Sequence, residues 1–259
     1  MVWSRRRMIR SGSLIALALA AQIMAARADQ RDDFLAGRTR DCPRCDLAGA
    51  RLKRRDLSGA DLAGANLKDA NLHDARLVGA RLGGADLTGA NLNKANLARA
   101  DLRGATLRDA MLYAAVLDAA DAAGADLTNA LMGTARLTRS NLSKARLDNV
   151  DLRKGRLAEA NLAGASLAAV ALDSATLRSA RLDGASLTEA RLIGTELIGA
   201  SLAGADLTDA NALGANLRGA DLTRATLRRT NFRRANLYET NLDGAIFDNT
   251  VMPDGTTRP

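Results

Sequence analysis

The chain has 259 residues, of which 47% are hydrophobic and 2% aromatic, and its formal net charge is +8. Five of the 37 Lys and Arg residues and none of the 29 Asp and Glu residues lie in residues 1–28, so the rest of the chain has 32 basic and 29 acidic residues, a net +3. That balance argues against nucleic-acid binding. The one His, His73, is expected to face outward, which argues against a Ser–His–Asp triad.

Residues 1–28 have the composition of a cleavable export signal. Four arginines lie in residues 5–10, residues 14–26 are apolar apart from Gln22, and Ala26-Arg27-Ala28 matches an A-x-A cleavage site. The apolar run of 13 residues is too short to cross a bilayer, and no Cys follows the site for lipidation. We therefore expect cleavage after Ala28 and a periplasmic or secreted mature chain that has no membrane span.

The type of export signal has two interpretations. Ser4-Arg5-Arg6-Arg7-Met8-Ile9-Arg10 resembles a twin-arginine signal, whose pathway carries folded proteins. The same arginines also suit the ordinary basic segment of a Sec signal. Both routes predict the same compartment.

Residues 29–45 precede the repeats and are expected to cap them. The open end of a solenoid exposes unpaired strand edges and needs a cover, and we expect Phe34 and Leu35 to lie over the first coil. Arg55 falls at a position where the repeats described below carry Ala, and a buried guanidinium there would need partners. The regular core is therefore expected to begin only near Asp56, with Arg55 reaching out at the rim.

Cys42 and Cys45 form a Cys-x-x-Cys pair, and both fall at inward-facing positions of the repeat. In an oxidising compartment a disulfide between them would fasten the cap. The alternative is two buried thiols that act as small apolar side chains. A thioredoxin-like role would need a βαβ setting. Zinc would need four ligands, and His73 is expected to face outward more than one coil away. We predict neither a redox site nor a metal site.

A period of five dominates the chain. Every fifth residue from Leu47 to Phe247 is apolar, with Leu at 36 of these 41 positions, and the position two residues earlier is Ala at 32 of 41. We call these two sets the Leu column and the Ala column. Residues five apart lie ~140° apart on a helix and alternate between faces on a straight strand. A solenoid of short strands, turning after each Leu, keeps all of them inside.

Glycine two residues after the Leu column recurs with a spacing of 20. Of the ten units in register with Gly64, eight carry Gly at this position, against eight of the other 31 units. Such a Gly suits a corner that needs positive φ, as in a type II turn. One such corner per 20 residues predicts a coil with four sides. About ten coils at the strand spacing of ~4.8 Å would form a rod ~50 Å long.

The repeating unit resembles that of a known family. Ala-Asn-Leu-Lys-Asp (65–69), Ala-Asp-Leu-Thr-Gly (85–89) and Ala-Asn-Leu-Ala-Arg (95–99) are similar to the A(D/N)LXX unit of pentapeptide-repeat proteins. Cys42-Pro43-Arg44-Cys45 and Met252-Pro253-Asp254-Gly255-Thr256 resemble the ends of that fold. The resemblance implies an all-β, right-handed quadrilateral parallel β-helix solenoid of about ten coils, which we assign to residues 46–250. Residues 251–259 would form a tail.

Outward apolar residues cluster on the side of the coil that contains Leu52 and Leu72. Clustered apolar side chains mark contact surfaces more often than scattered ones do. We predict a partner-binding patch there, made of Met111, Tyr113, Leu131, Ile193 and Leu213. The alternative is that each of them packs only on its neighbours in the β-ladder.

A basic collar surrounds the C-terminal coils. It consists of Arg224, Arg228, Arg229, Arg233 and Arg234. Such a collar could meet anionic lipid or polysaccharide, whereas single-stranded nucleic acid would need aromatic stacking platforms, of which only Tyr238 is near. An ordinary solvated face is the alternative interpretation.

These features predict a non-enzymatic protein without a cofactor or a catalytic site, because a core of Leu and Ala has no room for a substrate. We expect an exported, rigid binding or scaffolding rod whose partner is a protein or another envelope component. The family resemblance implies one alternative, since some members mimic DNA and protect DNA gyrase in the cytoplasm. The export signal and the balanced charge of residues 29–259 argue against that role.

Overall fold

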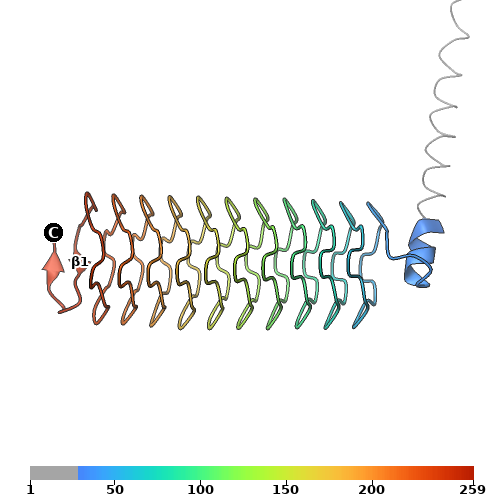
Figure 1. Ribbon diagram of the computed structural model, residues 1–259, viewed down its shortest axis with the longest axis horizontal. Coiled ribbons are helices and arrows are strands. Elements are labelled where there is room, and N and C mark those ends of the chain that lie inside the picture. The colour runs from blue at the N-terminus through green and yellow to red at the C-terminus, as the bar shows by residue number, and fades with distance from the viewer. Residues whose placement is uncertain (1–28) are drawn as a thin grey trace, which may run out of the picture.

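The computed structural model describes residues 29–259, which form a straight rod of stacked coils (Figure 1). A helix covers residues 29–35 at one end of the rod. At the other end, β1 (Thr250–Val251) pairs antiparallel with β2 (Thr257–Arg258). The predicted export signal and its cleavage site lie outside the described residues. Within residues 29–259, no helix is both long enough and apolar enough to cross a membrane.

Parallel β-bridges join each coil to the next. They link residues 20 apart, from Asp46 and Asn66 at one end to Asn231 and Val251 at the other. Around the first bridge, the amide of Leu47 donates to the carbonyl of Asn66 at 2.7 Å, and the amide of Asn66 donates to the carbonyl of Cys45 at 2.9 Å. Four five-residue units therefore separate residues that stack on one another.

Every unit turns in the same way after its Leu. The amide of Ala50 donates to the carbonyl of Leu47 at 3.0 Å, and this bond recurs along the rod. The residue two positions after the Leu column has positive φ in every unit, whether it is Gly or one of 26 other residues from Arg44 to Asn249. The spacing of glycine suggested that one corner per coil has a distinctive backbone. This expectation is wrong, because all the corners are left-handed at this residue.

The preference for Asp or Asn before each Leu has a local cause. These side chains accept a hydrogen bond from the backbone amide two residues later, as Asp56 does from Ser58 at 3.0 Å and Asn91 does from Asn93 at 3.1 Å. An Asx turn of this kind satisfies an amide at the corner that the ladder leaves unpaired. The Leu at the third position of the A(D/N)LXX unit thus fills the core, while the Asp or Asn at the second position stabilises the turn.

The core consists of the two inward columns. Every residue of the Leu column from Leu47 to Phe232 is buried. Thr195 and Thr230 in the Ala column are also buried, because their hydroxyls find carbonyl partners: Thr195 donates to the carbonyl of Leu172 and Thr230 to that of Leu207, both at 2.8 Å. A buried hydroxyl without such a partner would cost about 1–3 kcal/mol. Toward β1 the Leu column is only partly buried, at Leu237, Leu242 and Phe247.

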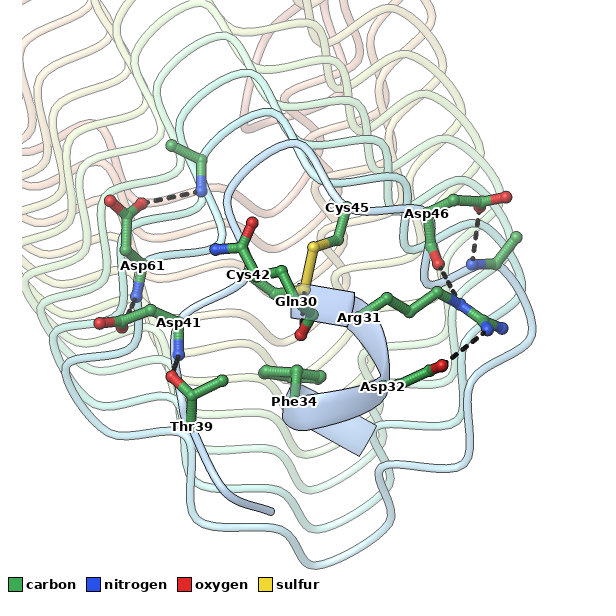
Figure 2. The surroundings of a disulfide bond; sticks show 12 residues. Gln30, Arg31, Asp32, Phe34, Thr39, Asp41, Cys42, Cys45, Asp46 and Asp61 are labelled. Atoms are coloured by element: carbon green, nitrogen blue, oxygen red, sulfur yellow. Dashed lines mark hydrogen bonds and ion pairs between the residues drawn. A yellow bond between two sulfur atoms is a disulfide. The ribbon is translucent and has the colours of Figure 1, made fainter. Parts of the chain in front are cut away.

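The N-terminal cap differs from the sequence expectation in two respects. Phe34 is fully buried at the mouth of the first coil (Figure 2), but Leu35 is 37% exposed. The regular register also begins before Asp56, since the amide of Cys42 already donates to the carbonyl of Asp61 at 2.8 Å. Arg55 does not interrupt it, because its guanidinium lies over the Phe34 ring and donates to the carbonyl of Phe34. Burial lowers the pKa of Arg55.

Candidate functional site

Two columns of outward side chains cross the side of the rod that was predicted to bind a partner. Tyr113, Gly133 and Arg153 follow one another at intervals of 20 residues in one column, one position after the Leu column. Met111 and Leu131 are bridged neighbours in the column one position before it. Stacking on successive coils therefore brings Met111, Tyr113 and Leu131 together.

These three residues form the apolar part of a shallow hollow of about 470 Å³. Its lining consists of Asn93, Met111, Tyr113, Leu131, Gly133, Thr134, Asp151, Arg153 and Lys154. We call it the apolar hollow. Tyr113 is 54% exposed and Leu131 is 51% exposed, so about half of each side chain faces water. Adjacent large apolar side chains that are exposed to this extent are typical of contact surfaces.

Gly133 opens the hollow. A Cβ at this position would lie 3.4 Å from Cδ2 of Tyr113, so the tyrosine ring lies close over the glycine backbone. The backbone of Tyr113 is fixed in turn, because its amide donates to Oδ1 of Asn93 at 2.8 Å. The floor of the hollow is therefore set by an unusual pair in the ladder, a tyrosine followed by a residue without a side chain.

One rim of the hollow is polar. Nε and Nη2 of Arg153 donate to the two carboxylate oxygens of Asp151 at 2.9 and 2.7 Å. The Arg153 guanidinium holds the pKa of the Asp151 carboxyl below its usual value, and the carboxylate raises the pKa of Arg153. Lys154 is exposed beside this pair and makes no ion pair among the described residues. A bound group at the rim would therefore meet a free ammonium group.

Ile193 and Leu213 belong to the same column as Tyr113 but lie outside the hollow. Both are partly buried. Asp173 stands in the column between Arg153 and Ile193, with its carboxylate 3.0 Å from Nη2 of Arg191. The five residues of the predicted patch are thus divided into a group of three around the hollow and a separate pair.

A second hollow, which sequence reasoning missed, lies on the neighbouring side. It has a volume of about 520 Å³ and is lined by Val78, Asn96, Ala98, Arg99, Asp118, Ala119, Arg136, Thr138 and Arg139. We call it the arginine hollow. The sequence does contain its signal, since Ala119 interrupts a column in which Arg99 and Arg139 are the flanking residues. A small residue between two long ones leaves a gap in the ladder.

The basic collar contains paired and unpaired arginines. Arg229 binds the carboxylate of Asp209 through Nε and Nη2, both at 2.7 Å. This hydrogen-bonded pair lowers the pKa of Asp209 and raises that of Arg229. Its other four members, Arg224, Arg228, Arg233 and Arg234, form no ion pair within residues 29–259. The collar is exposed, and salt would screen most of its field.

Cys42 and Cys45 form a disulfide, with their Cα atoms 5.4 Å apart. Both are buried between the cap helix and the first coil, and Sγ of Cys42 lies 3.7 Å from the carbonyl oxygen of Gln30 (Figure 2). The bond joins two residues three positions apart at the start of the first coil, next to the cap helix. Residues 29–259 contain no cluster of His, Cys, Asp or Glu suited to a metal ion.

The regular coils, their Leu and Ala core and their ladder hydrogen bonds define a β-helix-like repeat protein whose outer side chains are available for contacts. The model of the pentapeptide-repeat family matches residues 45–84, 80–118, 115–153, 156–188, 185–224 and 215–252, in eight copies. The chain belongs to the pentapeptide-repeat family. No functionally curated protein matches it.

Among solved structures, the chain is similar to HetL of the cyanobacterium Nostoc, a pentapeptide-repeat protein involved in regulating heterocyst differentiation. The identity is 31%, the match covers 81% of this chain and 94% of HetL, and the TM-score is 0.66. Alr5209 of Nostoc is 41% identical over 38% of this chain and 78% of its own, with a TM-score of 0.33. The plasmid-mediated fluoroquinolone resistance protein QnrB1 is 17% identical, over 57% of this chain and 86% of its own, with a TM-score of 0.30.

Proposed function

We propose that the protein is an exported, non-enzymatic binding rod that holds a protein or another envelope component against the apolar hollow. The observation that carries this proposal is the exposure of Tyr113 and Leu131 beside Gly133 on an otherwise regular ladder. Large apolar side chains left in water at one place on a soluble surface favour association. The polar rim of Asp151, Arg153 and Lys154 could form hydrogen bonds and ion pairs that orient the partner.

The proposal includes the finer architecture of the rod. We infer a right-handed quadrilateral parallel β-helix of about ten coils, supported by bridges between residues 20 apart and by one turn in every five residues. In such a rod each unit contacts only its neighbours, so the outer surface can vary while the core stays constant. A rigid surface also reduces the entropy that is lost when a partner binds.

Export is part of the proposal because of the arginines, the apolar segment and the A-x-A site in residues 1–28. A disulfide between Cys42 and Cys45 is consistent with an oxidising compartment. The cytoplasmic alternative, protection of DNA gyrase by a DNA mimic, would call for an acidic surface. Residues 29–259 have 32 basic and 29 acidic residues.

Site-specific photocrosslinking tests the binding role. A photoreactive phenylalanine analogue is placed at Tyr113 and, as the matched control, at Tyr238, which is 63% exposed and distant from the hollow. We expect defined adducts with envelope components from position 113 in intact cells, and their loss when Leu131→Ser is added. The same adducts from both positions, or adducts that survive Leu131→Ser, would contradict the proposal.

A further inference from the structure

We propose that the apolar hollow and the arginine hollow together bind one extended acidic peptide segment, with an apolar side chain in the first hollow and carboxylates in the second. This inference rests on the proposed binding role of the apolar hollow and adds the chemical class of the partner. It is carried by the geometry and the charge of the two hollows, which lie on neighbouring sides of the same coils.

The arginine hollow is a gap between two guanidinium side chains. Arg99, Ala119 and Arg139 occupy the same corner on three successive coils, and all three have positive φ. The outer two are separated by two ladder steps, about 10 Å. Ala119 places no long side chain between them, so a carboxylate can enter the gap and reach Arg99, whereas Arg139 is held by Glu159 on its other side.

The acidic residues near this gap are already engaged. Oδ1 of Asp118 accepts the amide of Thr138 at 3.0 Å, and its Oδ2 accepts from the guanidinium of Arg136. Glu159 accepts from Nε and Nη2 of Arg139 at 2.8 and 3.3 Å. Arg99 makes no ion pair within the described chain. The hollow therefore has positive charge that no carboxylate of residues 29–259 neutralises.

The linings of the two hollows hold more basic than acidic side chains, and among them Arg99 and Lys154 form no ion pair within residues 29–259. Their linings contain five basic residues and two acidic ones. Residues 29–259 as a whole have 32 basic and 29 acidic residues, so outside the hollows the two signs are equal in number. An anionic partner is therefore attracted to this part of the surface, and the basic collar is not the only region that could receive it.

A peptide can reach both hollows at once. Tyr113 and Ala119 are six residues apart, which limits their separation along the chain to about 20 Å. The corner between them has small outward side chains, Ala114 and Val116. An extended segment of similar length can therefore cross it. A nucleic acid fits less well, because Tyr113 is the only aromatic side chain in either lining and stacking platforms are absent there.

The test is a fluorescence-anisotropy titration of the whole mature chain with a fluorescein-labelled peptide. The peptide carries one Phe followed, three residues later, by three successive Glu residues. One control peptide has Gln in place of Glu, and a second has Ser in place of Phe. Arg99→Glu removes the free guanidinium, and Glu159 and Glu239 show that Glu is accepted in this column at positive φ. Arg228→Glu, on an exposed and unpaired arginine of the collar, is the matched charge control.

We expect the Glu peptide to bind at least about tenfold more tightly than the Gln peptide, a difference of ~1.4 kcal/mol. Arg99→Glu should abolish that difference and Arg228→Glu should leave it. Raising the salt concentration should lower the affinity for the Glu peptide more than the affinity for the Gln peptide, because the charges are exposed and salt screens them. The peptide with Ser in place of Phe should bind more weakly than the Glu peptide. Leu131→Ser in the protein should weaken the binding of both the Glu and the Gln peptide.

The outcomes separate the two proposals. Equal binding of the Glu and Gln peptides, lost with Leu131→Ser, would overturn the acidic-peptide inference and leave the apolar hollow as a binding site. Binding of neither peptide, or binding that Leu131→Ser does not change, would overturn both. Displacement of the peptide by single-stranded DNA at lower concentration than by unlabelled peptide would overturn the choice of a peptide partner.

Discussion

The guanidinium of Arg55 lies 4.5 Å from the centre of the Phe34 ring and donates to the carbonyl of Phe34. Arg55, which stands in the Ala column, therefore helps to hold the cap helix on the rod, together with Arg31, whose Nε donates to the carbonyl of Asp46 at 2.8 Å. A cation near the C-terminal end of a helix also interacts favourably with its unpaired carbonyls.

Replacing Arg55 should loosen the cap. Arg55→Ala is expected to lower the free energy of unfolding by about 1–3 kcal/mol, because it removes a part-buried hydrogen bond from a charged donor to the carbonyl of Phe34. Urea denaturation measures this change, and hydrogen exchange at residues 29–35 locates it. Arg54→Ala is the control, since Arg54 is exposed and its pair with Asp74 spans 3.3 Å; its effect should stay within about 1 kcal/mol. Equal losses for both variants would refute the role of Arg55.

Whether a leucine side chain points into the core or outward decides whether the fold tolerates a charged residue in its place. Leu142 is fully buried, so Leu142→Ala should cost about 2–5 kcal/mol, and Leu142→Asp should unfold the central coils because the charge would have no partner. Leu131→Asp is the matched control on an outward leucine that is 51% exposed. Circular dichroism melting should show a native-like transition for Leu131→Asp and none for Leu142→Asp. Similar melting of the two variants would contradict the assignment of the core.

Two adjacent glycines test the conformation of the corner. Gly84 has a φ of +64° with open space around it, whereas a Cβ at Gly83 would have ordinary contacts and Gly83 does not have positive φ. Gly84→Ala should therefore lower stability by about 1 kcal/mol. Gly83→Ala should be neutral or stabilising by up to about 1 kcal/mol. Equal effects in thermal unfolding would mean that the corner is not left-handed at Gly84.

Acid should destabilise the rod. Hydrogen bonds from Arg103 and Arg153 lower the pKa values of Asp101 and Asp151. A carboxyl with a lowered pKa in the folded state contributes stability above its unfolded value of ~3.9, and that contribution is lost as the pH falls through the folded pKa. Urea unfolding from pH 7 downward should show little loss until about pH 4 and a decline below it. The double variant Asp101→Asn, Asp151→Asn should decline less steeply. An unchanged slope would show that these carboxylates do not contribute.

Much of the core could be predicted from the sequence because the period of five leaves one arrangement that buries every Leu. The Leu column and the Ala column follow from that constraint, and the contact of Phe34 with the first coil follows from the need to cover the open end of the solenoid. The position of Arg55 could not be predicted, since the pattern shows an inward column but not a helix whose carbonyls receive the guanidinium.

The surface was less predictable than the core. Columns spaced by 20 residues identified Met111, Tyr113 and Leu131 as neighbours, but the hollow depends on the tyrosine ring lying over Gly133, and a periodic pattern carries no information on that. The arginine hollow escaped notice because Ala119 is typical of the repeat by composition. Its short side chain leaves a gap only because the long side chains of Arg99 and Arg139 flank it in the same column.

A rod that binds its partner outside the cytoplasm must first be exported and lose residues 1–28. Cell fractionation, with determination of the N-terminal residue of the accumulated protein, measures this. We expect a periplasmic or secreted chain that begins at Asp29. A cytoplasmic chain that begins at Met1 would contradict export, restore the basic charge of residues 1–28, and make DNA gyrase and DNA the partners to test next.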